Sequence, residues 1–145
     1  MIKLLSSFSK PSLLTLAALT LALGLQALRA QTQCPAMNAT MEGTYVMSGS
    51  GTIVGVGAIA SVGVVTYDGQ GNGLGTSTTV VNGATSRGTV PGTFTVNRDC
   101  TGSKTFGSGP SATHFDFVIT PDGSKITWIV TDPGVIMTGT ATRMR

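Results

Sequence analysis

Turn-forming residues at short intervals constrain the fold of this chain more than any other feature. From Gly43 onward, runs of apolar and β-branched residues are interrupted repeatedly by Gly, Asn, Asp and Pro. The Asn-Gly pair at 82–83 is typical of a type I′ hairpin turn, because both central positions of that turn need a positive φ. Pro-Asp-Gly at 121–123 and Asp-Pro-Gly at 132–134 carry further turn chemistry. The pattern predicts short strands joined mostly by tight turns.

The composition favours strands over helices. Nineteen of the 20 glycines lie after residue 30, among many Thr and Val residues, and these residue types rank low in helices. Pro91 lies inside one predicted strand and lacks a ladder donor, so we expect a bulge or a break there. The predicted strands cover residues 43–50, 59–67, 73–81, 86–97, 102–106, 113–120, 125–131 and 135–143.

Eight short strands joined in this way predict an all-β fold, an antiparallel meander. Open sheet edges are a liability, and pairing of the first strand with the eighth would remove them. We therefore expect an eight-stranded antiparallel up-and-down barrel. A two-sheet β-sandwich is the alternative, and only residues 51–58 and 107–112 could supply its longer crossover connections.

Alternation along the strands predicts which side chains face the interior. Phe115, Phe117 and Ile119 share one face of a strand, and Trp128 lies on one face of the next. An eight-stranded barrel has an interior just wide enough to be filled by side chains or to hold one small ligand. If a ligand is held, the residues that we expect to line its site are Tyr45, Tyr67, Phe117 and Trp128.

Residues 1–30 have the order of residues typical of a secretory signal peptide. Lys3 and Lys10 precede an uncharged apolar run, and the best cleavage point follows Ala30. We expect a polar lead over residues 31–42, with one helical turn, and a barrel domain over residues 43–145. The location would be secreted or periplasmic, with no membrane insertion after cleavage.

Removal of that segment changes the charge of the chain. Three of the nine Lys and Arg residues leave with it. The remaining chain has six basic and six acidic residues, hence a net charge of zero, with no run of like charge. A neutral surface does not favour nucleic acid, whose binding needs a basic face. The sequence does not predict the oligomeric state.

The only two cysteines, Cys34 and Cys100, lie after the export segment. In an oxidising compartment an even pair is typical of one disulfide. The alternative is a free catalytic thiol, which is less favoured because no histidine lies near either cysteine in the sequence.

Catalytic and metal-binding signals are sparse. His114 is the only histidine, and Asp116 shares its strand face, so this couple is the one candidate for general-base chemistry. A polar pair on the solvent face is the favoured interpretation, because alternation turns the neighbouring phenylalanines inward. One histidine, two paired cysteines and dispersed aspartates do not form an ordinary zinc site, and we expect no metal and no cofactor.

Three segments resemble a group of small, uncharacterised secreted bacterial proteins. These are Gly-Thr-Tyr at 43–45, Val-Gly-Val-Val-Thr-Tyr-Asp-Gly-x-Gly-Asn at 62–72 and Gly-Thr-Phe-Thr-Val-Asn-x-Asp-Cys-Thr-Gly at 92–102. The overall pattern is also similar to calycin-type barrels of lipocalin, avidin or allene oxide cyclase architecture. The Gly-x-Trp signature of lipocalins is not present near the first strand, so the resemblance implies no binding residue.

Three functions fit these observations. The favoured hypothesis is a non-catalytic protein that binds a small apolar molecule inside the barrel. An isomerase or cyclase would use the barrel pocket to shape a substrate while His114 and Asp116 move a proton. A structural or surface-interaction protein would have a filled barrel.

Overall fold

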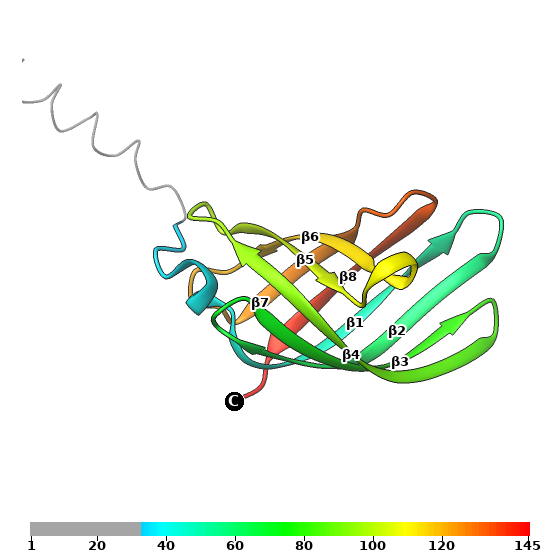
Figure 1. Cartoon of the computed structure of the whole chain (residues 1–145), viewed down its shortest axis with the longest axis horizontal. Helices are drawn as coiled ribbons and strands as arrows, with labels where there is room; N and C mark the ends of the chain where they lie inside the picture. Colours follow the sequence, from blue (N-terminus) through cyan, green and yellow to red (C-terminus); the bar gives the residue numbers. More distant parts are fainter. Residues whose placement is uncertain (1–32) are drawn as a thin grey trace, which may run out of the picture. The chain divides into compact units, whose positions relative to one another are not determined.

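The structure is a computed structural model that describes residues 33–145. The signal peptide expected over residues 1–30 therefore lies outside the described residues. The described part consists almost entirely of strands (Figure 1). These are β1 (Glu42–Ile53), β2 (Gly57–Asp68), β3 (Asn72–Val81), β4 (Ala84–Val96), β5 (Thr101–Phe106), β6 (Thr113–Ile119), β7 (Lys125–Val130) and β8 (Val135–Arg143). Two short 3₁₀ turns, η2 (Met37–Thr40) and η3 (Gly109–Ser111), complete the described structure. Within residues 33–145, no helix is long and apolar enough to span a membrane.

The eight strands form one closed antiparallel barrel in sequence order. The closing pair is β1 with β8, whose register runs from Tyr45 opposite Arg143 to Ile53 opposite Val135. Because the long β1–β8 pairing closes the sheet on itself, the sandwich alternative is wrong and the up-and-down barrel is confirmed.

The turn at 82–83 shows the expected chemistry. Asn82 has φ 45° and Gly83 has φ 85°, and the strands on either side pair from Val81 opposite Ala84 onward. Both central residues therefore have the positive φ that a type I′ hairpin needs.

Two local expectations about the strands were wrong. Residues 51–58 form no long loop, because β1 and β2 extend to Ile53 and Gly57 and pair along their full length. Pro91 causes neither a bulge nor a break: β3 and β4 stay in one register across it, with Leu74 opposite Pro91. The Pro91 carbonyl accepts from Gly107 N at 2.9 Å, so the proline nitrogen faces the β5 side, where the β4–β5 pairing has already ended.

β4 has a hydrogen-bonded neighbour on both edges for only part of its length. Along one edge it pairs with β3 from Ala84 to Thr93, whereas along the other it pairs with β5 only over residues 92–96. The side chains from Ala84 to Pro91 are all exposed. One stretch of the barrel wall is thus hydrogen-bonded along a single edge.

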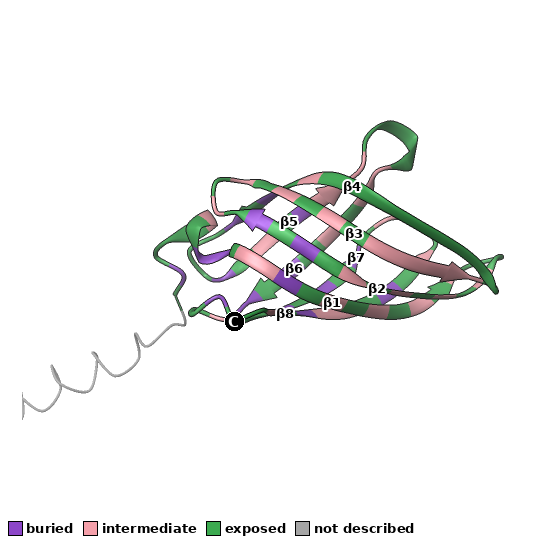
Figure 2. Cartoon of the chain, turned by 90° about the horizontal axis from the view of Figure 1, so that it is seen from below, coloured by how far each residue is buried: buried purple, intermediate pink, exposed green. Residues whose placement is uncertain are grey.

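Buried residues gather toward one end of the barrel. Figure 2 shows buried positions near the N-terminal segment, whereas the β1–β2 and β3–β4 hairpins at the opposite end are exposed or half-buried. The core comprises Tyr45, Tyr67, Phe94, Val96, Phe117, Ile119, Ile126, Trp128 and Ala141, among others. We call the packed end the closed end and the other the open end.

Large inward side chains lie against glycines of neighbouring strands. A Cβ placed on Gly139 of β8 or on Gly49 of β1 would come within 2.2 Å of the Trp128 ring. A Cβ on Gly102 would come within 2.4 Å of Phe117. At these positions the narrow interior accommodates an aromatic ring because the next strand carries no side chain there.

The N-terminal segment covers the closed end. Cys34 forms the expected disulfide with Cys100 in the β4–β5 turn, and both cysteines are buried. Asn38 Oδ1 accepts from Val96 N at 2.8 Å, and Met41 is fully buried. The disulfide is confirmed, and it indicates a non-reducing compartment.

We predict that Gly139→Ala lowers the free energy of unfolding by about 1–3 kcal/mol, as overpacking does in other cores. The new methyl group would meet both Trp128 and the Ser48 carbonyl oxygen, 2.3 Å away, and the backbone atom cannot move aside cheaply. Urea denaturation measures the change. Gly88→Ala is the matched control, because a Cβ there meets no atom within 4 Å and the change should stay within about 0.5 kcal/mol. Equal effects of the two substitutions would contradict the packing argument.

We predict that protein produced in an oxidising compartment has no reactive thiol, and that replacing both cysteines by serine lowers the free energy of unfolding by about 2–5 kcal/mol. The bond joins residues separated by 66 positions, so its loss frees a long loop in the unfolded chain. A thiol assay under denaturing, non-reducing conditions tests the first part and urea denaturation the second. Two reactive thiols per chain would show that the pairing is wrong.

Candidate functional site

A cavity of about 330 Å³ lies inside the open end of the barrel. Inward side chains from every strand line it, together with Ser111 and Asp132 from the loops at the rim. Its lining is mostly apolar, and it includes Met47, Ile59, Val65, Phe106, Phe115 and Val135. The barrel is therefore filled at the closed end and hollow at the open end.

Lys104 is the one charged side chain of the strands that lines this cavity. It lies on β5 between Gly102 and Phe106 on the inward face, and its exposed fraction is 5%. Its Nζ atom is 5.1 Å from the ring centre of Phe115 and 5.4 Å from that of Trp128. Phe117 lies slightly farther away, at 6.0 Å. The amine thus lies among three aromatic rings at the base of the cavity.

The amine has almost no polar surroundings. Its single hydrogen bond in the described part of the chain is a long one, donated to Tyr67 Oη at 3.4 Å, and it takes part in no salt bridge there. Burial disfavours the charged form and lowers the pKa of Lys104 to about 7. Near neutral pH, a substantial fraction of this amine is uncharged.

Trp128 carries a second polar group with few partners, buried beside the cavity. Its side chain is 3% exposed, and its Nε1 atom is buried without a hydrogen-bond partner among the described residues. Such orphaned donors are uncommon in folded proteins. By contrast, the hydroxyls of Ser61 and Thr79, which also line the cavity, hydrogen-bond to each other at 3.0 Å.

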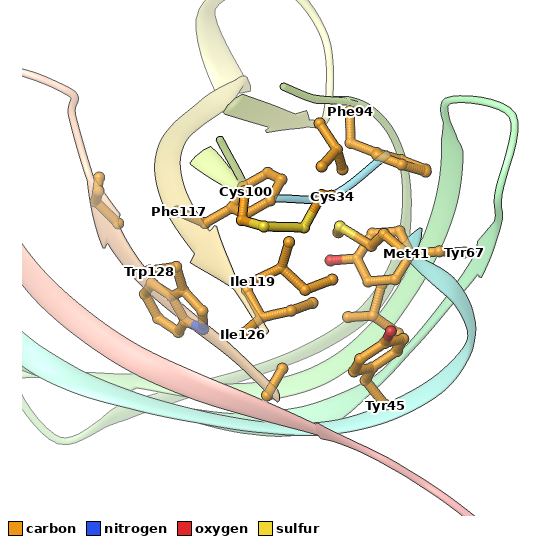
Figure 3. Packing of buried hydrophobic residues seen from close by; sticks show 14 of the residues in the cluster. Cys34, Met41, Tyr45, Tyr67, Phe94, Cys100, Phe117, Ile119, Ile126 and Trp128 are labelled. Atoms are coloured by element: carbon orange, nitrogen blue, oxygen red, sulfur yellow. A yellow bond between two sulfur atoms is a disulfide. The ribbon is translucent and has the colours of Figure 1, made fainter. Parts of the chain in front are cut away.

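Of the four side chains expected to line a ligand site, Trp128 lines this cavity. The other three belong to the packed core (Figure 3). Tyr45 donates its hydroxyl hydrogen to the Gly123 carbonyl at 2.6 Å, and burial raises its pKa. Tyr67 lies beneath Lys104, and Phe117 packs over a glycine of β5. Contact of these four residues with a ligand remains a prediction.

His114 is hydrogen-bonded to Asp132 instead of Asp116. Its Nδ1 atom is 2.7 Å from Asp132 Oδ1, and its backbone N–H donates to Asp132 Oδ2 at 2.9 Å. These bonds to His114 hold the pKa of Asp132 below its usual value. His114 and Asp116 are both exposed on the outer face of β6. The contact ties the start of β6 to the β7–β8 loop at the rim.

Sequence reasoning missed Lys104. In the segment Gly-Ser-Lys-Thr-Phe at 102–106, Lys104 alternates with Gly102 and Phe106, so all three share a face. The inward position of Phe106 was therefore a signal that Lys104 also points inward. The rule that lysines are rarely buried works against that interpretation.

Comparisons with known proteins add a distant fold similarity. No known family pattern and no curated protein matches the chain. Among solved structures, the chain is similar to the S-type phycobiliprotein lyase CPES from Guillardia theta, with 7% sequence identity and a TM-score of 0.43. The alignment covers 74% of this chain and 90% of that one. The resemblance to calycin-type barrels stays a prediction.

We predict that the free energy of unfolding rises between pH 7 and pH 9.5 because of Lys104. Its pKa is about 7 in the folded protein and about 10.4 in an unfolded chain, so the unfolded state binds more protons in this range. The slope from this group is at most about 1.4 kcal/mol per pH unit. Urea denaturation across the range should show this rise in the original protein and lose it in Lys104→Met. The exposed Lys125→Met is the control, and a rise that persists in Lys104→Met would contradict the assignment.

Proposed function

We propose that this protein binds a small, mainly apolar molecule in the cavity at the open end of the barrel. The observation that carries the proposal is the cavity itself, about 330 Å³ in volume and lined mostly by aliphatic and aromatic side chains. Pockets that hold small molecules are commonly about 300–1,000 Å³, so this one suits a ligand at the small end of that range.

The uneven filling of the barrel supports binding over a purely structural role. A structural barrel would be stabilised by side chains that fill both ends, because interiors are normally close-packed. Here close packing stops at Trp128 and Phe115, and the space beyond them is bordered by small residues such as Gly75 and Ser77.

One polar group supports a ligand that also carries an oxygen atom. Lys104 makes a single long hydrogen bond within residues 33–145. Buried donors without acceptors cost free energy that a ligand acceptor would recover. The preferred ligand is therefore apolar over most of its surface, with a polar group near Lys104.

The isomerase or cyclase alternative finds less support. His114 and Asp116 lie on the outer face of the barrel, and the ring of His114 is held by Asp132 at the rim. A general base must reach the proton that it removes. A ligand inside the cavity would be separated from these two side chains by the barrel wall.

We predict that 1-octanol changes the fluorescence of Trp128 in a saturable manner. Trp128 is the only tryptophan of the chain and lines the cavity, so its emission reports directly on occupancy. Ser77→Phe places a ring on the inward face of β3 and should abolish the response, whereas Thr78→Phe, which points outward on the same strand, should retain it.

Two results would count against this proposal. One is an unchanged response in Ser77→Phe, which would locate the alcohol elsewhere. The other is no response in the original protein at any soluble concentration of 1-octanol. Native mass spectrometry of protein recovered from its own host tests the proposal independently. We expect a co-purifying ligand, seen as an additional mass that is lost on denaturation.

A further inference from the structure

We propose that Lys104 captures the carbonyl group of an apolar aldehyde or ketone as an imine inside the cavity. This inference rests on the proposed function and specifies the chemical class of its ligand. It follows from the position of the amine among three aromatic rings, at the base of a cavity that is otherwise apolar.

The surroundings of Lys104 suit a nucleophilic amine. Imine formation requires an uncharged amine with a free lone pair, and lysines acquire this form in desolvated sites. Lys104 is 5% exposed, and the long contact with Tyr67 is its only hydrogen bond in the described structure. The other titratable group of the lining, Asp132, is engaged with His114 at the rim.

The aromatic rings favour a carbonyl ligand over a carboxylate. The face of an aromatic ring carries partial negative charge, so it attracts cations and disfavours anions. A carboxylate paired with Lys104 would bring its oxygens close to Phe115, Phe117 and Trp128. A neutral carbonyl compound avoids this cost, and the neutral imine that it forms also brings no negative charge near the rings.

The atoms of the reaction balance without any further reagent. Nζ attacks the carbonyl carbon and forms a carbinolamine, which loses its hydroxyl group to give the C=N bond and one water molecule. Tyr67 Oη, 3.4 Å from Nζ, is placed to protonate the leaving hydroxyl and to recover a proton from the imine nitrogen. Burial raises the pKa of Tyr67 well above its usual value, so the phenol stays protonated until that step.

Reductive trapping tests the proposal directly. The protein, produced with its disulfide formed, is incubated with octanal and sodium cyanoborohydride at pH 7.5. The modified lysine is identified by peptide mass spectrometry. We expect N-octyl-lysine at Lys104 with a yield at least about tenfold above that at the exposed Lys125, because an amine in water is almost wholly protonated at this pH. The yield at Lys104 should rise with pH through about 7, the pKa of its amine.

Three variants separate the cavity from the reaction. Lys104→Met should lower the total octyl incorporation to the background of the exposed amines, while 1-octanol still alters Trp128 fluorescence with an affinity weakened by loss of the polar contact. Lys125→Arg should change neither. Ser77→Phe should reduce both trapping and the response, because it fills the cavity that both ligands use.

The outcomes distinguish the two proposals. If 1-octanol and octanal both alter Trp128 fluorescence but Lys104 is modified no more than Lys125, imine capture is overturned and apolar binding stands. If neither compound alters the fluorescence, the proposed function fails and the inference fails with it. Selective modification of Lys104 that persists in Ser77→Phe would also overturn the inference, since the aldehyde would then reach the amine without the cavity.

Discussion

The contact between Trp128 and the paired glycines Gly139 and Gly49 divides the barrel into two parts. The indole spans three adjacent strands because β8 and β1 carry no side chain where it lies. On one side of it the aromatic and aliphatic core continues to the disulfide. On the other side it borders the cavity and contacts Phe115 edge-on, with 5.4 Å between ring centres. Trp128 thus belongs both to the packed core that stabilises the fold and to the floor of the candidate site.

A buried lysine at this floor has an energetic cost, and the closed end supplies stability to offset it. The N-terminal segment, the disulfide and the hydrogen bonds from Arg143 to Tyr45 and Thr40 fix the packed end independently of the cavity. A destabilising amine can persist where the rest of the structure holds it in place, and such groups concentrate at functional sites. The barrel therefore separates, along its axis, the packing that stabilises the fold from the buried amine and the cavity.

The sequence predicts much of the fold because turn chemistry is local. The Asn-Gly turn, the alternation around Phe117 and the pair of cysteines each depend on a few neighbouring residues, and each is confirmed. Pro91 was misjudged because its effect depends on which edge of β4 its nitrogen faces, and that follows only from where β5 ends. The position of Lys104 among three rings of β6 and β7 likewise requires the register between strands. Asp132, the partner of His114, lies 18 residues away, beyond the end of β7, so no local sequence pattern predicts this contact.

The single-edge attachment of β4 bears on which molecules could enter. From Ala84 to Val90 this strand is hydrogen-bonded to β3 alone, while Val90 on its inner face borders the cavity. Outward displacement of that stretch breaks no hydrogen bond to β5, whereas β1 is paired with both β2 and β8 up to Ile53 at the same end. Bending of the β3–β4 hairpin alone would therefore widen the cavity, while the paired strands elsewhere keep the circumference of the barrel unchanged.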